Sequence, residues 1–295
     1  MTHLNDLFKP EWQFVLPGFY AGLVVAAICA YLGVYVVLKR IVFVGAALSE
    51  LAAVGVALAF WPLLIHHVGF LARMDTETTR PLFLALVLVL AGVAFFSQQG
   101  VGREVPREAI IGLTYGAATA FTIIFLSISK GAEQETIHLI QGDILTISSA
   151  AIRQLLIVAV PIALIHALFY KEFVLVSYDP ETARTLGFRS PLLELLFYLT
   201  LGLMIAVAFK VAGSLTVFGY MVLPAVAALK LTRRLGLAFV IAIVLALVAT
   251  LCGVYISSWQ GSDIPMGPAI IGAATVLVAV SALAAGALRL ALRRS

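Results

Sequence analysis

Long apolar runs separated by short polar segments make up almost the whole chain. A helix that crosses a bilayer needs about 20 mainly apolar residues, and most of these runs reach or approach that length. The pattern therefore predicts an all-α polytopic membrane protein with about nine transmembrane helices. The nine runs span residues 14–38, 42–65, 81–97, 109–128, 152–170, 191–209, 214–229, 235–258 and 266–290.

The sixth and seventh runs are the hardest to separate. Only residues 210–213 lie between them, and Gly213, Gly219 and Pro224 interrupt the helical pattern. Two separate spans and a broken or re-entrant helix are both compatible with this sequence. Irregular backbone at membrane depth is tolerated only where protein or a water-filled cavity surrounds it. We therefore expect Gly213, Ser214 and Pro224 to line a translocation path.

Composition excludes a water-soluble domain. The 295 residues are 62% hydrophobic and only 12% charged, whereas soluble domains average roughly 45–50% and 25%. Cys29 and Cys252 lie inside apolar runs, so no disulfide framework or CxxC pair is expected. The net charge of +4 is scattered, and no basic stripe with interleaved aromatic residues indicates a nucleic-acid partner. One transmembrane domain, residues 1–295, with lipid as its surroundings, accounts for the chain.

The positions of the 19 lysine and arginine residues predict the orientation. If the N-terminus is outside, thirteen of them fall on the cytoplasmic side and six on the other, as expected from the excess of positive charge in cytoplasmic loops. We therefore expect the N-terminus outside and the C-terminus in the cytoplasm. Residues 1–13 lack the basic start of a secretory signal and are typical of an interfacial segment. Residues 137–147 predict a short surface helix.

Signatures of catalysis are missing from the sequence. It contains no GxxxxGK[ST] phosphate loop, no HExxH zinc motif and no GxSxG nucleophile turn. We therefore expect that the chain is not an enzyme and has no catalytic residues, and that any ATP is bound by another chain. A polytopic protein with a few intramembrane polar groups is instead typical of a transport pathway.

Glu50 is the one acidic residue deep inside a predicted span. It follows Arg40 by ten residues, which places it about 15 Å from the cytoplasmic edge of a core about 30 Å thick. A charge there costs about 2.5–3.5 kcal/mol, so the carboxyl group should face a cavity, a partner or an ion. A protonated Glu50 bonded to a neighbouring helix and a carboxylate that faces a cation are both compatible with this position. We assign Ser49 and Glu50 to the predicted path and name Glu50 as the candidate metal ligand.

Pairs of small residues four positions apart occur at Gly18 and Gly22 and at Gly112 and Gly116. Such pairs allow two helices to approach closely. We expect both pairs to seal helices within the bundle rather than to mark a dimer face.

Residues 177–188 predict a short polar helix on the cytoplasmic side. Asp179 suits the N-cap, Pro180 suits the first turn, and Glu181 suits the positive end of the helix dipole. Gly187 suits the C-terminal end. Such a helix could be an ordinary connection or could press on a soluble partner.

Three stretches together resemble the permease subunits of the zinc, manganese and iron ABC importers, the ABC-3 type. The first, 31–59, contains YLGVYVVLKR and VFVGAALSELAAVGVAL. The second, 141–148, reads QGDILTIS and is similar to a GDIL element of that family. The third, 175–224, contains the SYDPETARTLGF helix followed by VAGSLTVFGYMVLPA.

This resemblance implies a type II importer fold in the bacterial cytoplasmic membrane. Two copies of the permease would form the path, two ATP-binding subunits would dock below, and an extracytoplasmic metal-binding protein would deliver a divalent metal ion from above. The permease itself would bind no cofactor, and ATP would be bound by the partner subunit. The helix that couples to the ATPase would contain Asp179, Pro180, Glu181, Ala183, Arg184 and Gly187.

The sequence departs from this family at one place. Members that move zinc or manganese typically carry an Asp and, four residues later, a His on the second helix, whereas this chain has Ala46 and Glu50 there. Two copies of Glu50 could form a carboxylate site that suits manganese or ferrous iron better than zinc. Alternatively, the cargo is a metal chelate or another small solute without direct coordination. A stand-alone secondary transporter that uses Glu50 is a third hypothesis.

Overall fold

The computed structural model describes residues 16–75, 79–97, 106–129, 149–188, 190–258 and 264–294, and every regular element in these ranges is a helix. The expected all-α class is therefore confirmed for this part of the chain. The predicted interfacial segment 1–13, the predicted surface helix 137–147 and the GDIL-like stretch 141–148 lie outside the described residues.

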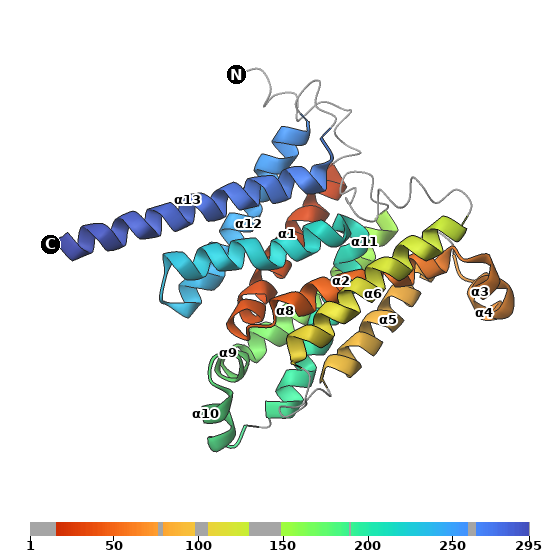
Figure 1. Cartoon of the computed structure of the whole chain (residues 1–295), viewed down its shortest axis with the longest axis horizontal. Helices are drawn as coiled ribbons and strands as arrows, with labels where there is room; N and C mark the ends of the chain where they lie inside the picture. The colour runs from red at the N-terminus through yellow and green to blue at the C-terminus, as the bar shows by residue number, and fades with distance from the viewer. Residues whose placement is uncertain are drawn as a thin grey trace.

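Eight helices of the described chain are long and apolar enough to cross a membrane. Figure 1 shows them as a bundle of long helices, with short helices at its ends. The long helices are α1 (Leu16–Leu38), α2 (Val42–Ala59), α5 (Thr79–Ser97), α6 (Arg107–Ile128), α8 (Ser149–Leu168), α11 (Ser190–Leu231), α12 (Leu235–Ser257) and α13 (Met266–Arg294). The short helices are α3 (Pro62–His67), α4 (Gly69–Ala72), α9 (Tyr170–Tyr178) and α10 (Pro180–Thr185).

Helix α11 contains two of the nine predicted runs in one element. If straight, its 42 residues would extend about 63 Å, twice the thickness of a hydrocarbon core. At Gly213, however, φ is 76° and ψ is 165°, which is not a helical conformation. Figure 1 shows α11 turning sharply about half-way along. The irregular backbone expected here is thus located at Gly213, and α11 contains the sixth and seventh predicted runs. The second run, 42–65, is longer than its helix, because α2 ends at Ala59 and the remaining residues lie in a turn and in α3.

Helices α1 and α11 form the centre of the bundle. Helix α1 contacts α11 and α12, and α2 contacts α5, α6 and α11. The backbones of α1 and α11 touch at Gly33, because a Cβ there would overlap the carbonyl group of Met221. Only glycine permits this approach. Helices α1 and α11 are therefore held at a fixed distance by backbone contact rather than by adjustable side chains.

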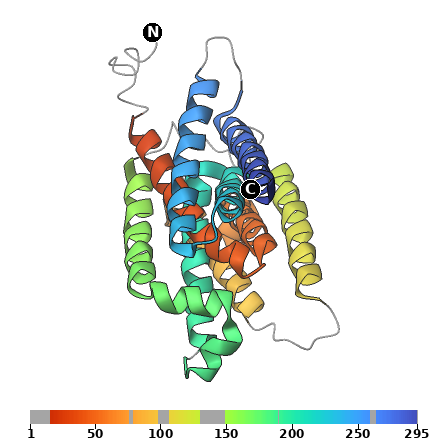
Figure 2. The ribbon, with the colours of Figure 1, turned by 90° about the vertical axis from the view of Figure 1, so that its left-hand side faces the viewer.

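Helices α6 and α8 lie at opposite edges of the bundle (Figure 2). Both expose large apolar side chains, among them Leu113 at 73% and Ile157 at 71%. On a soluble protein such surfaces would cause aggregation, whereas in a membrane they face lipid or another apolar protein surface. The exposed faces therefore agree with the membrane class predicted from composition.

The two pairs of small residues behave differently. Gly18 and Gly22 are buried in α1, as expected for a seal within the bundle. At Gly112 and Gly116 in α6, by contrast, an added Cβ would meet no atom within 4 Å. The expectation for α6 is therefore wrong within this single chain, because its small-residue face is turned away from the bundle and remains open.

Candidate translocation site and coupling helix

Glu50 lies near the middle of α2. It is eight residues from Val42, so it stands about 12 Å along the helix, and the flanking residues 44–49 are buried. The Glu50 side chain is only partly buried. Glu50 therefore lies near the middle of a helix that is long and apolar enough to cross a membrane, and its carboxyl group remains accessible.

Two hydroxyl groups from other helices approach the Glu50 carboxyl group. Thr119 of α6 donates a hydrogen bond of 3.3 Å from Oγ1 to Oε2 of Glu50. Ser214 of α11 also lies close enough to interact with this carboxyl group. Ser214 is 6% exposed and follows Gly213 directly, so the break in α11 sets the position of its hydroxyl. Three helices therefore meet at one oxygen-rich point, which we call the Glu50 site (Glu50, Thr119 and Ser214).

The predicted path residues do not all reach this site. Ser49 is 1% exposed and donates a 2.9 Å hydrogen bond to the Gly45 carbonyl oxygen of its own helix. Pro224 is buried in the second half of α11, ten residues beyond Ser214. Glu50, Gly213 and Ser214 are thus brought together. The described contacts do not place Ser49 or Pro224 with them.

The Glu50 carboxyl group retains acceptor capacity. A carboxylate has about four lone-pair positions, and the 3.3 Å bond from Thr119 is long because the same hydroxyl also makes a 2.9 Å bond to the Tyr115 carbonyl oxygen. Among the described residues, no lysine, arginine or histidine forms an ion pair with Glu50. The carboxyl group is thus partly exposed, has unused acceptor positions and has no cationic partner among the described residues.

The ligand set at this site is incomplete in one chain. Within the described ranges there is no group of three or more His, Cys, Asp and Glu side chains that could hold a metal ion. Ala46, one turn before Glu50, is 8% exposed and contributes only a methyl group. The site therefore offers oxygen ligands from one carboxylate and two hydroxyl groups, and no nitrogen or sulfur.

Helix α10 has defined ends. The Asp179 carboxylate accepts a 3.0 Å bond from the Thr182 backbone N–H and a 2.6 Å bond from the Thr182 hydroxyl, and these bonds hold the pKa of Asp179 below its ordinary value. At the other end, Gly187 adopts φ 81°, its N–H donates to the Arg184 carbonyl, and the next N–H donates to the Ala183 carbonyl. This is a Schellman motif. The predicted cap at Asp179 and the predicted end at Gly187 are both present.

Most of α10 is exposed. Ala183 faces inward and is 0% exposed, whereas the side chains of Glu181 and Arg184 are exposed. Tyr178 and Leu186, which flank the helix, are 70% and 64% exposed. Figure 1 shows α10 projecting beyond the ends of the long helices. Helix α10 therefore presents an exposed polar surface with large exposed apolar side chains at both of its ends.

An aromatic cluster connects the α9–α10 segment to the bundle. Phe173 of α9 stacks on His166 of α8, with ring centroids 4.5 Å apart, and makes edge contacts with Tyr35 of α1 and Phe197 of α11. His166 Nε2 lies 2.9 Å from Thr200 Oγ1, whose hydroxyl donates to the Phe197 carbonyl, so the ring nitrogen is the donor. Displacement of α9 would therefore move side chains on three transmembrane helices together.

Sequence reasoning missed several of these residues. Thr119 lies inside an apolar run 69 positions after Glu50, and no local pattern relates the two. Its hydroxyl in a membrane span was the available signal, because such groups commonly bond to neighbouring helices. His166 and Phe173 are seven residues apart in sequence, but their stacking depends on the turn between α8 and α9.

Comparison with known proteins identifies the family. The model of the ABC 3 transport family matches residues 11–285. The chain belongs to this family. The resemblance noted in the sequence is thus confirmed, and the chain is a multi-pass membrane permease of the bacterial inner membrane, with the fold class expected for such permeases.

Relatives in this family extend over nearly the same length. The manganese transport system membrane protein MntC of Halalkalibacterium halodurans is 24% identical, with 95% of this chain and 91% of the relative covered. A probable iron transport system membrane protein of Haemophilus influenzae is 27% identical, with 95% and 93% covered. The chelated iron transport system membrane protein YfeD of Yersinia pestis is 25% identical, with 83% and 77% covered.

Two solved structures share the fold of this chain. A chain of PsaBC from Streptococcus pneumoniae, in complex with Fab, superimposes with a TM-score of 0.78 at 20% identity and covers 94% of this chain and 93% of its own. A transporter described as being of metal-chelate type, in an inward-facing conformation, superimposes with a TM-score of 0.69 at 16% identity, covering 92% and 88%. The likeness covers almost the whole chain.

Proposed function

We propose that this ABC 3 permease moves a divalent transition-metal ion across the cytoplasmic membrane by alternating access. The observation that carries the proposal is the Glu50 site, where α2, α6 and the broken helix α11 place a carboxylate and two hydroxyl groups at membrane mid-depth. Relatives named for manganese and iron transport support this cargo class. A carboxylate in such a place is typical of an ion path.

Oxygen ligands favour a hard cation. Carboxylate and hydroxyl oxygens suit manganese and ferrous iron, whereas zinc-selective sites usually include nitrogen or sulfur. The three side chains that define the Glu50 site contribute neither. We therefore place manganese or ferrous iron before zinc as the transported ion, with Glu50 as its direct ligand on the path.

A second copy of the chain completes the path in this proposal. The open face of α6 includes Gly112 and Gly116, and Thr119 of the same helix bonds Glu50. Small residues on an exposed transmembrane face allow another helix to approach closely. In a homodimer that is joined along α6, the two Glu50 carboxylates would lie on either side of one shared passage.

Energy comes from a separate ATPase subunit that docks on α10. With the N-terminus outside, the C-terminus inside and both halves of α11 crossing the membrane, α10 lies on the cytoplasmic side. The exposed face of α10 and the aromatic cluster around Phe173 support its role as the coupling helix. Nucleotide-driven movement of α10 would then favour one of two arrangements of the permease halves. An extracytoplasmic binding protein delivers the cargo on the other side.

A metal chelate is the second candidate cargo. The described residues hold no cluster of three metal-binding side chains, which is compatible with a cargo whose metal is held by its own chelator. The Yersinia pestis relative is named for chelated iron. In this case Glu50 would be a polar wall residue, and its charge would matter little for uptake.

Transport by reconstituted protein tests the proposal. The chain and its co-purifying ATPase are placed in liposomes with ATP and a fluorescent metal indicator inside, and uptake of Mn²⁺ or Fe²⁺ supplied outside with the binding protein is compared with uptake without ATP. We expect ATP-dependent uptake that is lost when residues 179–187 are scrambled and when Glu50→Ala is introduced. Uptake that survives the scramble rejects the coupling role of α10. Unchanged uptake by Glu50→Ala rejects direct coordination and favours the chelate. Transport by the chain without any ATPase would reject the ABC mechanism.

A further inference from the structure

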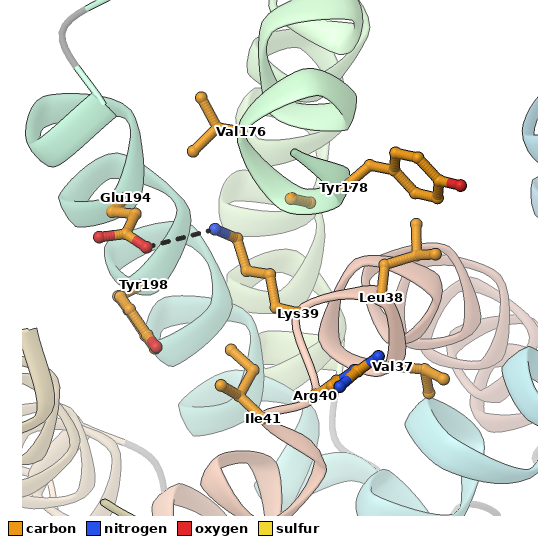
Figure 3. A pocket seen from close by; sticks show the side chains of 10 residues that line it. Val37, Leu38, Lys39, Arg40, Ile41, Val176, Tyr178, Glu194 and Tyr198 are labelled. Carbon is orange, nitrogen blue, oxygen red and sulfur yellow. Dashed lines mark ion pairs between the residues drawn. The ribbon is translucent and has the colours of Figure 1, made fainter. Parts of the chain in front are cut away.

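A pocket of about 670 Å³ opens beside the end of α9, next to the proposed coupling helix α10. The turn between α1 and α2 forms one wall, the end of α9 forms another, and the first turns of α11 form a third. Figure 3 shows Lys39, Arg40, Tyr178 and Glu194 around it. The pocket has no role in the path described above, because it lies at the end of the bundle next to α10.

Of the two basic residues that line this pocket, Lys39 has an acidic partner in the described chain and Arg40 does not. Lys39 Nζ lies 3.6 Å from Glu194 Oε1 and 5.5 Å from the centre of the Phe197 ring, so its charge is satisfied within the chain. Arg40 is exposed and forms no ion pair with any residue that the structure describes. In Figure 3 the Lys39 side chain points toward Glu194, whereas Arg40 points away from that pair. One positive charge therefore remains available at the pocket.

The backbone of Arg40 is in an unfavourable conformation. Its φ is 57°, which lies in the left-handed region that glycine adopts at lower cost. The turn holds it there, because the Arg40 N–H donates to the Val37 carbonyl and the Ile41 N–H donates to the Val36 carbonyl. A helix that ends in this way usually has glycine at this position. An arginine there indicates a use for its side chain that outweighs the local cost.

We propose that the ATPase subunit places an acidic side chain in this pocket, against Arg40, as a second contact beside the coupling helix. The inference rests on the proposed function, in which α10 docks on the ATPase. The wall from Val176 to Tyr178 leads directly into Asp179 and α10, so the pocket is continuous with that docking surface. Guanidinium and carboxylate groups form strong paired hydrogen bonds.

A lipid headgroup is the competing anionic occupant. A headgroup would reach the pocket from the perimeter of the bundle, whereas the pocket is lined on three sides by segments of this chain, one of which leads directly into α10. The exposed Tyr178 ring at the pocket edge also suits a protein interface, because aromatic residues are enriched in such interfaces. The geometry thus favours the ATPase over the membrane surface.

Replacement of Arg40 by glycine gives a clean test. Because glycine adopts positive φ readily, Arg40→Gly keeps the turn and removes only the side chain. We expect Arg40→Gly to weaken ATPase binding about tenfold in lipid nanodiscs, with a larger loss for Arg40→Glu and no loss of thermal stability for Arg40→Gly. The effect should shrink at high salt. Arg233→Gly, at the exposed turn between α11 and α12, is the matched control and should bind the ATPase normally.

A photoreactive residue in place of Tyr178 identifies the occupant. Cross-linking to an ATPase peptide that contains Asp or Glu supports the proposal, whereas cross-linking to lipid alone overturns it. Normal ATPase binding by Arg40→Gly also overturns it. Failure of the proposed function looks different: the wild-type chain would then bind no ATPase, or scrambling of residues 179–187 would leave binding intact.

Discussion

Replacement of the Glu50 carboxylate by an amide, Glu50→Gln, separates charge from shape at the Glu50 site. The amide keeps the size of the side chain and an oxygen that can accept the Thr119 hydrogen bond, but it removes the negative charge. Insertion into the membrane should improve slightly, because a buried charge is costly there. Any loss of transport would therefore report on the ion rather than on assembly.

The expected magnitude follows from Coulomb's law. A divalent cation about 4 Å from the carboxylate gains about 8 kcal/mol at an effective dielectric constant of about 20, the value for partly exposed groups. Loss of water from the ion and the carboxylate offsets most of this gain. If about a quarter remains, about 2 kcal/mol, then Glu50→Gln weakens the interaction about thirtyfold. Thr119→Val, which removes one long hydrogen bond but leaves the charge, should cost only about fivefold.

Uptake of Mn²⁺ at subsaturating concentration, by the chain reconstituted with its ATPase, is the measurement. Ser49→Ala is the matched control, because Ser49 lies next to Glu50 but its hydroxyl bonds only to the Gly45 carbonyl of the same helix. We expect wild-type uptake from this control. Uptake by Glu50→Gln within twofold of wild type, with an intact ATPase complex, would refute direct contact between Glu50 and the ion.

Three further predictions follow from helix contacts and caps. In Gly33→Ala the added Cβ would overlap the Met221 carbonyl group, so the Tm of the detergent-solubilised chain should fall by at least about 5 °C. The control Gly116→Ala adds a Cβ in open space and should leave the Tm unchanged. Gly116→Trp should preserve the fold but reduce self-association in sedimentation experiments; a persistent dimer would exclude α6 from the interface. Hydrogen bonds from Thr182 lower the pKa of Asp179, so the N-cap of α10 should persist as the pH falls through the ordinary range of aspartate titration and be lost only near the lowered pKa. Thr182→Val removes the hydroxyl that donates to Asp179. Binding of the ATPase by this variant should therefore be lost at a higher pH than binding by the wild type.

Local features of this protein could be predicted from the sequence because short-range physics determines them. Apolar runs long enough to span a bilayer predict transmembrane helices wherever they occur. The cap at Asp179 and the left-handed end at Gly187 depend on residues within one or two turns, and both are present. Irregular backbone near Gly213 was also expected, because glycine and proline interrupt helices whatever surrounds them.

Contacts between residues far apart in the sequence determine the features that the sequence alone could not predict. The bond between Thr119 and Glu50 joins residues 69 positions apart, and Arg40 could not be seen as a left-handed residue beside a pocket until α1, α9 and α11 were placed together. For a related reason, the prediction that Gly112 and Gly116 pack α6 against the bundle was wrong, because this face of α6 is open. In a soluble protein the polar face of a helix marks its exposed side. In a membrane both the lipid-facing and the bundle-facing sides are apolar, so the sequence determined which segments are helices, and only the tertiary structure decided which faces meet.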